Sequence, residues 1–214
     1  MSDIKVNDEK HERIINAAME EFVHGFAQAK TDNIAKAAGV SKGLLFHYFG
    51  TKEKLFAFLI DNAIRIIRTE FLDRVNPRQP DLIETIWQMS LLKQEVSRRY
   101  PAMFDFLTST YLDTRHSIEA AQIEQLTKFT QMRNQILAEA VAHCDRSRFR
   151  QGIEPERALE IIDWTLKGYA EAMTNRAKQQ SGISQVGADA RENYERYLSE
   201  FKVYIDIFRQ CFYK

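Results

Sequence analysis

Residues 31–55 read TDNIAKAAGVSKGLLFHYFGTKEKL, and this stretch decides the fold expected for the chain. Apolar residues recur at helical spacing from Ile34 to Ala38, which predicts a first helix of about two turns. Gly39 follows where the backbone must leave that helix, a position that favours a residue without a β-carbon. Ser41 is placed to cap a second short helix. The stretch therefore predicts a helix-turn-helix.

The outward side of the second helix carries the groups that could read DNA. Lys42 and His47 can donate hydrogen bonds to base acceptors, and Leu44 can touch a thymine methyl. Gly43 has no side chain, which would let the backbone approach a phosphate near the helix N-terminus. Leu45 and Phe49 lie four residues apart and are expected in the core.

Three further residues are expected to fix the position of the helix on the DNA. Thr31, Tyr48 and Lys52 could reach phosphates, which set the docking register and carry no base sequence information. Thr31 is also expected to cap the first helix. Lys52 begins the next helix, where the helix dipole disfavours a cation unless an anion such as phosphate compensates.

The chain resembles the tetracycline-repressor-like (TetR) family of transcriptional regulators over roughly its first quarter. The residues that carry the resemblance are Ile15, Ala18, Phe22, Gly25, Phe26, Thr31, Ile34, Ala35, Ala38, Gly39, Val40, Ser41, Lys42, Gly43, Phe46, Tyr48, Phe49, Lys52 and Leu55. The resemblance, with the capping serine added, implies a DNA-binding set of Thr31, Ser41, Lys42, Gly43, Leu44, Phe46, His47, Tyr48 and Lys52. Phe46 stands where many members have tyrosine, so a hydroxyl contact is lost there.

This resemblance implies an all-α protein with two parts. Residues 1–50 would form a three-helix DNA-binding domain, and residues 51–214 a larger helical domain for effector binding and dimerisation. The implied function is that of a ligand-responsive repressor, which binds a palindromic operator as a homodimer and is released by a small effector, expected to be apolar or amphipathic. Neither the effector, the operator nor the regulated genes can be read from the sequence.

The charges are balanced overall and basic only locally. Lysine plus arginine equals aspartate plus glutamate at 30 each, so no global positive field attracts nucleic acid. Between Lys30 and Lys54, however, five lysines face two acidic residues. We therefore expect weak non-specific binding and a small specific footprint that a dimer doubles.

The remaining sequence is helical in pattern almost throughout. A connecting helix is expected from Lys52 to about Arg74, followed by helices at roughly 82–99, 102–114, 117–144, 155–180 and 190–213. Arg146, Arg148 and Arg150 are interpreted as a solvated run in the loop before the fourth of these later helices.

The last two helices carry the strongest amphipathic pattern, and the family resemblance implies that they pair with a second subunit. The dimer interface is expected at Ile161, Thr165, Tyr169, Met173, Tyr197, Phe201, Tyr204 and Phe208. The alternative is that these residues complete a monomer core. An effector pocket is expected at Trp87, Phe104, Thr108, Tyr111, Phe129, Met132 and Trp164, although most of these are also suited to an ordinary core.

Other classes of function have little support in the sequence. No phosphate-binding glycine loop or nucleophile elbow occurs, so no catalytic residue and no cofactor is expected. The five histidines show no metal-ligand spacing, and for His143 beside Cys144 a helix-end histidine is the commoner explanation. A protein-interaction module without DNA binding remains the main alternative, with an enzyme behind it. With no signal peptide or membrane span in the pattern, a cytoplasmic location is expected, and two distant cysteines do not indicate a disulfide.

Overall fold

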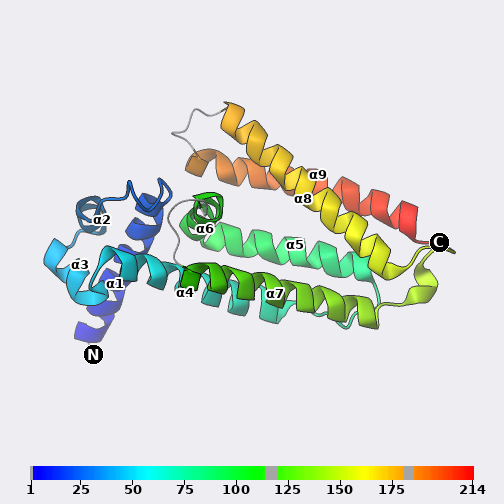
Figure 1. Ribbon diagram of the computed structural model, residues 1–214, viewed down its shortest axis with the longest axis horizontal. Coiled ribbons are helices and arrows are strands. Elements are labelled where there is room, and N and C mark those ends of the chain that lie inside the picture. Colours follow the sequence, from blue (N-terminus) through cyan, green and yellow to red (C-terminus); the bar gives the residue numbers. More distant parts are fainter. Residues whose placement is uncertain (1, 114–119, 181–185) are drawn as a thin grey trace. The chain divides into compact units, whose positions relative to one another are not determined.

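The computed structural model describes residues 2–113, 120–180 and 186–214, and within them the side chains of residues 9–107, 109–110, 124, 127–169, 171–172 and 198–214. The described chain is all helical apart from one isolated β-bridge between Phe149 and Tyr213. The helices are α1 (Ser2–Phe22), α2 (Thr31–Ala38), α3 (Lys42–Phe49), α4 (Lys52–Glu70), α5 (Leu82–Arg99), α6 (Pro101–Asp113), α7 (Ala120–His143), α8 (Pro155–Gln180) and α9 (Val186–Phe212), with short 3-10 helices at Leu72–Arg74 and Arg146–Arg148 (Figure 1).

The all-α class predicted from the sequence is confirmed, and most helix ends agree with the expected ones. The main difference lies in the connecting helix, which ends at Glu70 and not near Arg74. A break at Phe71 is followed by the 3-10 turn Leu72–Arg74. Phe71 and Leu72 at this break are both buried. The packing of these two side chains, and not a proline or glycine, therefore ends the helix.

The chain divides into two compact units. Unit 1 comprises Met1–Arg68 and Arg99–Thr130, and unit 2 comprises Thr69–Arg98 and Gln131–Lys214. These units do not follow the expected domain boundary at residue 50, because α4 and α6 share a core with the first three helices. The boundary between functional domains stays a prediction.

The core of unit 1 is a cluster of phenylalanines from α1, α4 and α6. The ring of Phe22 lies 5.0 Å from that of Phe56, and Phe56 lies 5.4 Å from Phe106. Phe26 closes the cluster at 5.1 Å from Phe56. The Ser109 hydroxyl donates to the Val23 carbonyl at 2.6 Å and so fixes α6 to the end of α1. Aromatic pairs at these distances add to the stabilisation from burial alone, which makes this cluster a rigid base for the helix-turn-helix.

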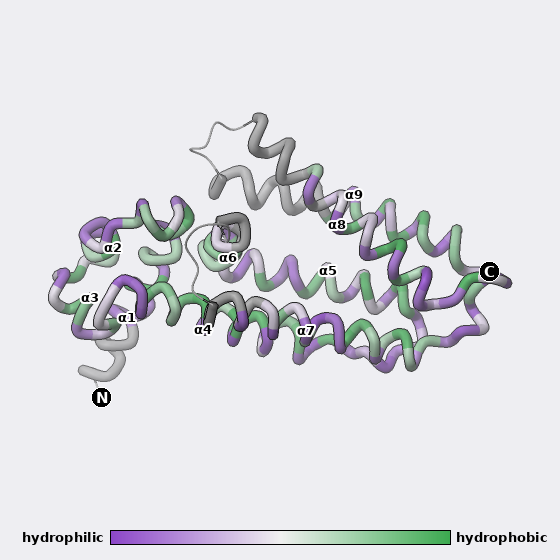
Figure 2. Tube along the Cα trace, in the orientation of Figure 1, coloured by the Kyte–Doolittle hydropathy of each residue, from purple (hydrophilic) through white to green (hydrophobic). Residues whose placement is uncertain are grey.

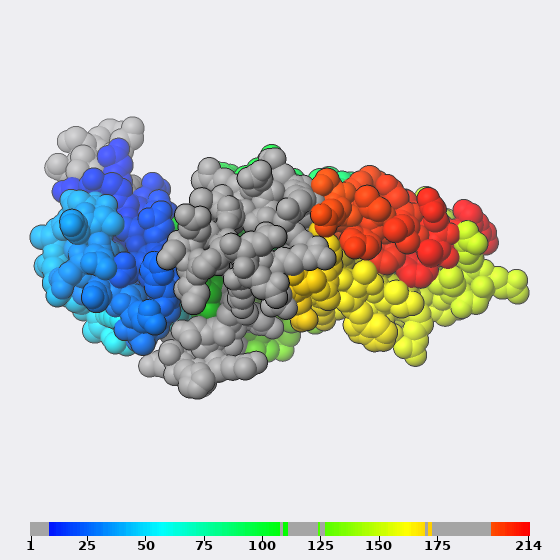
Figure 3. All heavy atoms as spheres, turned by 90° about the horizontal axis from the view of Figure 1, so that it is seen from above, coloured from blue at the N-terminus to red at the C-terminus, as the bar shows by residue number. Residues whose placement is uncertain are grey.

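Unit 2 is built from α5, the C-terminal part of α7, α8 and α9. Apolar and polar positions alternate along the described parts of α5 and α9 (Figure 2), and the apolar positions Leu82, Leu137, Ile162 and Ile205 are buried. Figure 3 shows the described parts of α8 (yellow) and α9 (red) side by side.

The loop arginines of unit 2 retain accessible surface, as expected of a solvated run, but they also form specific contacts. Arg146 forms ion pairs with Glu154 and Glu156. Arg148 pairs with Asp81 at 3.1 Å, and Arg150 donates to the backbone carbonyls of Gln210 and Tyr213 at 2.7 Å each. These contacts fasten the C-terminal end of α9 to the loop before α8.

The predicted cap of α2 is wrong. Lys30 holds the N-cap position without a side-chain bond, and Thr31 is already helical. Glu21 of α1 instead holds the start of α2 in place: its Oε1 accepts from Lys30 N at 2.8 Å and from Asn33 Nδ2 at 3.0 Å. The long sequence separation explains why the local pattern did not predict this contact.

Replacing Glu21 by alanine is therefore expected to lower the free energy of unfolding by about 1 kcal/mol, because it leaves the Lys30 N–H and the Asn33 side-chain amide without their acceptor. Urea unfolding followed by circular dichroism measures this. The matched control is Glu20→Ala at the exposed neighbouring position. Equal losses for the two variants would show that the contacts of Glu21 do not stabilise the start of α2.

Candidate nucleic-acid interface

The turn between α2 and α3 has the predicted geometry. Gly39 is left-handed, with φ 65°, and the N–H of Val40 donates to the Ala35 carbonyl at 3.0 Å. Ser41 caps α3 by accepting from Leu44 N at 3.1 Å. The predicted roles of Gly39 and Ser41 are confirmed.

Buried residues orient both helices so that one side of α3 stays at the surface. Ile34 of α2 and Leu45 of α3 are completely buried, and Phe49 is nearly so. On the other side, Ser41, Lys42, Gly43 and His47 are exposed, whereas Leu44, Phe46 and Tyr48 are half-buried. Thr31 and Lys52 are also half-buried. All members of the predicted DNA-binding set are thus described residues that retain accessible surface.

Gly43 is not required by the protein's own packing. A β-carbon added there would meet only the Ser41 Oγ, at 3.9 Å, and the backbone is not left-handed at this residue. Any requirement for glycine would therefore come from a molecule that approaches α3 closely.

Lys42 forms an ion pair across the helix-turn-helix. Its ammonium lies 2.8 Å from Asp32 Oδ1, and both side chains are at least half exposed. Exposed pairs of this kind are worth about 0–1 kcal/mol. Asp32 therefore holds Lys42 only weakly, and an anionic partner of higher charge density could replace it.

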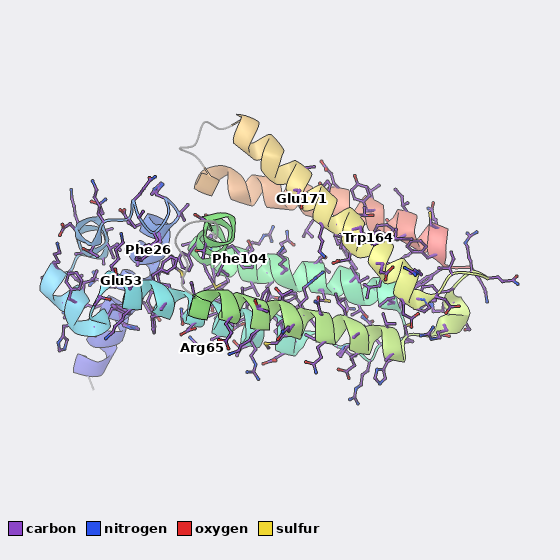
Figure 4. All side chains as sticks on the ribbon, viewed as in Figure 1. Phe26, Glu53, Arg65, Phe104, Trp164 and Glu171 are labelled. Carbon is purple, nitrogen blue, oxygen red and sulfur yellow. The ribbon has the colours of Figure 1, made fainter. Side chains whose placement is uncertain are left out.

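The start of α4 carries a cap and a carboxylate of its own. Thr51 Oγ1 accepts from Lys54 N at 3.2 Å. Glu53 (labelled in Figure 4) receives hydrogen bonds from its own backbone N–H and from the Thr51 hydroxyl, which lower the pKa of its carboxyl. Glu53 is thus an anion within the chain that can compensate the charge of Lys52. The Lys52 ammonium itself lies 4.7 Å from the centre of the Phe26 ring, a cation–π contact.

His11 of α1 packs against α3 on its inner side, and the helix-turn-helix motif did not predict this contact. Its ring stacks on Phe49 at 5.3 Å and meets the edges of Tyr48 and Phe58 at 5.6 Å each. His11 lies about thirty-seven positions before Tyr48, so only the tertiary structure brings the two together.

The residues expected to line an effector pocket are placed on several helices. Trp87, Phe104, Phe129 and Met132 are half-buried. Trp87 packs on Phe201 of α9 at 5.9 Å, with the Lys202 ammonium 5.4 Å from its ring. Trp164 (Figure 4) is 65% exposed, which fits the outer face of α8 and not a pocket wall. The side chains of Thr108 and Tyr111 lie outside the described residues.

The residues expected at the dimer interface divide into two groups. Phe201 and Phe208 are buried within unit 2, so they are already covered by their own chain. Ile161 is exposed, and Thr165, Tyr169 and Tyr204 are half-buried, with the rings of the two tyrosines 5.3 Å apart. The side chains of Met173 and Tyr197 lie outside the described residues. Among the described side chains of α8 and α9, the exposed large apolar ones are Ile161, Trp164, Val203 and Ile207, and we call these four the apolar face.

No alternative site emerges in the described parts of the chain. There, no group of three or more histidine, cysteine or acidic side chains is placed to hold a metal. His143 Nδ1 hydrogen-bonds the Glu139 carbonyl at 2.9 Å, and burial raises the pKa of the Cys144 thiol. None of the helices searched combines the length and apolarity needed to cross a membrane.

Comparisons with known proteins agree with this geometry. Residues 14–58 match the family model described as bacterial regulatory proteins, tetR family. The chain is 26% identical over 147 residues to the HTH-type transcriptional regulator PksA of Bacillus subtilis, covering 65% of this chain and 67% of PksA. It is 28% identical over 139 residues to SrpR of Pseudomonas putida, also an HTH-type transcriptional regulator, covering 63% of this chain and 62% of SrpR, less than two thirds of that relative's length.

The fold is shared over nearly the whole chain. The crystal structure of a TetR family transcriptional regulator from Chloroflexus aurantiacus superposes with a TM-score of 0.59 over 97% of this chain and 94% of that one, at 16% identity. The relatives that the chain resembles are HTH-type transcriptional regulators and not enzymes. Residues 14–58 therefore form an N-terminal domain similar to that of the tetR family of bacterial regulatory proteins.

Proposed function

We propose that the chain is a ligand-responsive repressor that binds a palindromic operator as a homodimer in the cytoplasm. The observation that carries the proposal is the exposed side of α3, where Lys42 and His47 project from a helix whose opposite side is locked into the core. Because a recognition helix meets base edges with its N-terminal residues, these two side chains are suited to read sequence.

Phosphate contacts complete the surface. Lys52 and Tyr48 flank the exposed side of α3 and would fix its register in the groove. Gly43 supports a close backbone approach, since nothing in the described protein requires glycine there. Lys42 would exchange Asp32 for DNA at a cost below about 1 kcal/mol.

Dimerisation places two such surfaces on one DNA. The apolar face of α8 and α9 supports this, because four large apolar side chains are exposed on the two helices for which the family resemblance implies a subunit contact. We assign the interface to Ile161, Trp164, Val203 and Ile207 together with Thr165, Tyr169 and Tyr204, and not to Phe201 and Phe208. Effector binding in the helical body would then alter the spacing of the two heads through α4, by favouring one of two conformations.

Gel-shift titration of the duplex upstream of the chain's own gene tests this function. Lys42→Ala and His47→Ala are each expected to weaken specific binding by about tenfold or more, because one good base contact is worth ~1–3 kcal/mol in each half-site. Lys52→Ala is expected to lower affinity for all sequences alike and to reduce the salt dependence.

The same titration separates the alternative function. Specific retardation that the Lys42 and His47 variants weaken supports the regulator. Absence of retardation by a folded dimer would favour a protein-interaction module that uses the apolar face without DNA.

A further inference from the structure

Lys52 rests its ammonium on an aromatic ring and not on a carboxylate. Its Nζ lies 4.7 Å from the centre of the Phe26 ring. Glu53 is an anion nearby, but its carboxylate accepts from its own N–H and from the Thr51 hydroxyl. In the described part of the chain, no carboxylate forms an ion pair with Lys52. The ring of Phe26 is therefore the contact that orients this lysine.

Phe26 is itself held in place by a backbone turn and by two rings of the core. Gly25 has a φ of 93°, in the left-handed region that favours glycine, and its N–H donates to the Phe22 carbonyl at 2.9 Å. After this turn the Phe26 ring lies parallel to that of Phe22, with the centres 5.9 Å apart. The Phe56 ring meets it at 66°, with the centres 5.1 Å apart. Phe26, labelled in Figure 4, is thus a fixed but only half-buried surface.

The two lysines beside the exposed side of α3 are held by different means. Lys42 pairs with Asp32 at 2.8 Å, and a phosphate or a base must displace that carboxylate before it can bind the ammonium. A phenyl ring has no net charge and attracts a cation only through its quadrupole. Because an ammonium has three N–H donors, Lys52 can stay on the ring and still offer its charge to a phosphate.

The contact also restricts a flexible side chain before any partner binds. Lysine has a long flexible stem, and fixing such a side chain on binding opposes association. Lys52 is the first residue of α4 and is half-buried, so its stem already lies along the protein. A lysine held in advance loses less freedom when it meets DNA, and binding is correspondingly tighter.

We propose that Phe26 is a positioning residue for DNA binding, whose ring holds the Lys52 ammonium where it meets a phosphate of the operator backbone. The inference rests on the proposed function and deepens it, because it concerns the same surface and the same phosphate contact. Phe26 lies before α2, outside the helix-turn-helix, and acts through Lys52.

Gel-shift titration of full-length variants on the upstream duplex, and on an unrelated duplex of equal length, tests this role. Phe26→Leu keeps an apolar side chain and removes the ring. It is expected to weaken binding by about threefold per half-site, and so by about tenfold for a dimer. The factor should be the same for both duplexes, because phosphate contacts carry no base sequence information. Phe26→Tyr keeps the ring and should bind like the wild type.

A double-mutant cycle separates positioning from a general effect on the domain. In the Lys52→Ala background, Phe26→Leu is expected to cause no further loss of affinity, because the ring then has no ammonium to hold. An equal loss in both backgrounds would show that Phe26 acts on the domain as a whole. That result, or operator binding by Phe26→Leu as tight as that of the wild type or tighter, would overturn the proposal.

A second measurement uses the wild-type protein and does not depend on the folding of a Phe26 variant. Protons above the face of an aromatic ring resonate upfield. In protein labelled with 13C-lysine, the methylene next to the Lys52 ammonium should therefore resonate upfield of those of the exposed Lys36 and Lys54. The signal is assigned by its absence from Lys52→Ala. Operator DNA should leave the upfield shift in place, and its absence in the free protein or its loss on DNA binding would contradict the proposal.

The proposed function and this inference fail in different ways. If the wild-type protein ignores the upstream duplex, the repressor function is wrong and the role of Phe26 in DNA binding falls with it. If the duplex is retarded specifically and Lys52→Ala weakens binding while Phe26→Leu does not, the function stands and the role of Phe26 alone is wrong.

Discussion

Replacing Asp81 by alanine is expected to lower the free energy of unfolding by about 2 kcal/mol, because the loss removes a largely buried carboxylate that accepts several hydrogen bonds and pairs with two half-buried arginines. The Asp81 side chain is only 13% exposed and lies 2.7 Å from Arg209 Nη1 and 3.1 Å from Arg148 Nη1. The Tyr213 hydroxyl and the Glu84 backbone N–H each donate to its Oδ1, at 2.9 Å. One carboxylate therefore joins the start of α5 to the C-terminal end of the chain.

Urea unfolding at neutral pH measures this loss. Asp206→Ala is the matched control, since Asp206 is an exposed aspartate of α9 that pairs with Lys202 four residues away. Such pairs contribute about 0.5 kcal/mol or less. If Asp81→Ala cost no more than the control, the contacts around Asp81 would not stabilise the fold.

The stability that Asp81 contributes is also expected to depend on pH in a definite direction. Burial would raise the pKa of the Asp81 carboxyl, but hydrogen bonds from Glu84 N–H, Arg209 and Tyr213 lower it overall. A carboxyl with a lowered folded-state pKa contributes stability above its unfolded pKa of ~3.9, and loses it as the pH falls through the folded value. The difference between wild type and Asp81→Asn should therefore be largest near neutral pH and shrink below about pH 4.

Ile207→Glu is expected to convert the protein from dimer to monomer at micromolar concentration and to weaken operator binding by about a hundredfold or more. The two-fold axis of a dimer would bring two introduced carboxylates into one apolar contact, where desolvation and repulsion oppose association. Ile207 lies one helical turn from Val203, and both are exposed on α9. Analytical ultracentrifugation gives the mass, and the gel shift gives the affinity.

Leu91→Glu makes the same chemical change at an exposed apolar residue of α5 outside the apolar face. It should leave the dimer and operator binding intact. If both variants stayed dimeric, the interface would lie elsewhere, and if both became monomeric, the loss would reflect a general surface effect and not the apolar face.

The helix-turn-helix could be predicted from the sequence because its determinants are local. Gly39, Ser41 and the apolar spacing from Ile34 to Phe49 each act within a few residues, and the structure places them as expected. The contact that holds the start of α2 could not be predicted, since Glu21 reaches it from another helix. His11 behind Tyr48 was missed for the same reason.

In the helical body, the periodicity of apolar residues was not enough to predict which of them are buried. The amphipathic pattern of α9 was clear, but it did not show which apolar residues face the chain's own core. Phe201 and Phe208 face inward, whereas Val203 and Ile207 remain exposed.

Hydroxyl-radical footprinting of the upstream duplex tests the central claim most directly, namely that two copies of the α3 surface read DNA together. The wild-type protein should protect two symmetric half-sites about 34 Å apart, or a multiple of that spacing, and Lys42→Ala should remove protection at both. Uniform protection without symmetry, or a symmetric footprint that Lys42→Ala and His47→Ala leave unchanged, would contradict it.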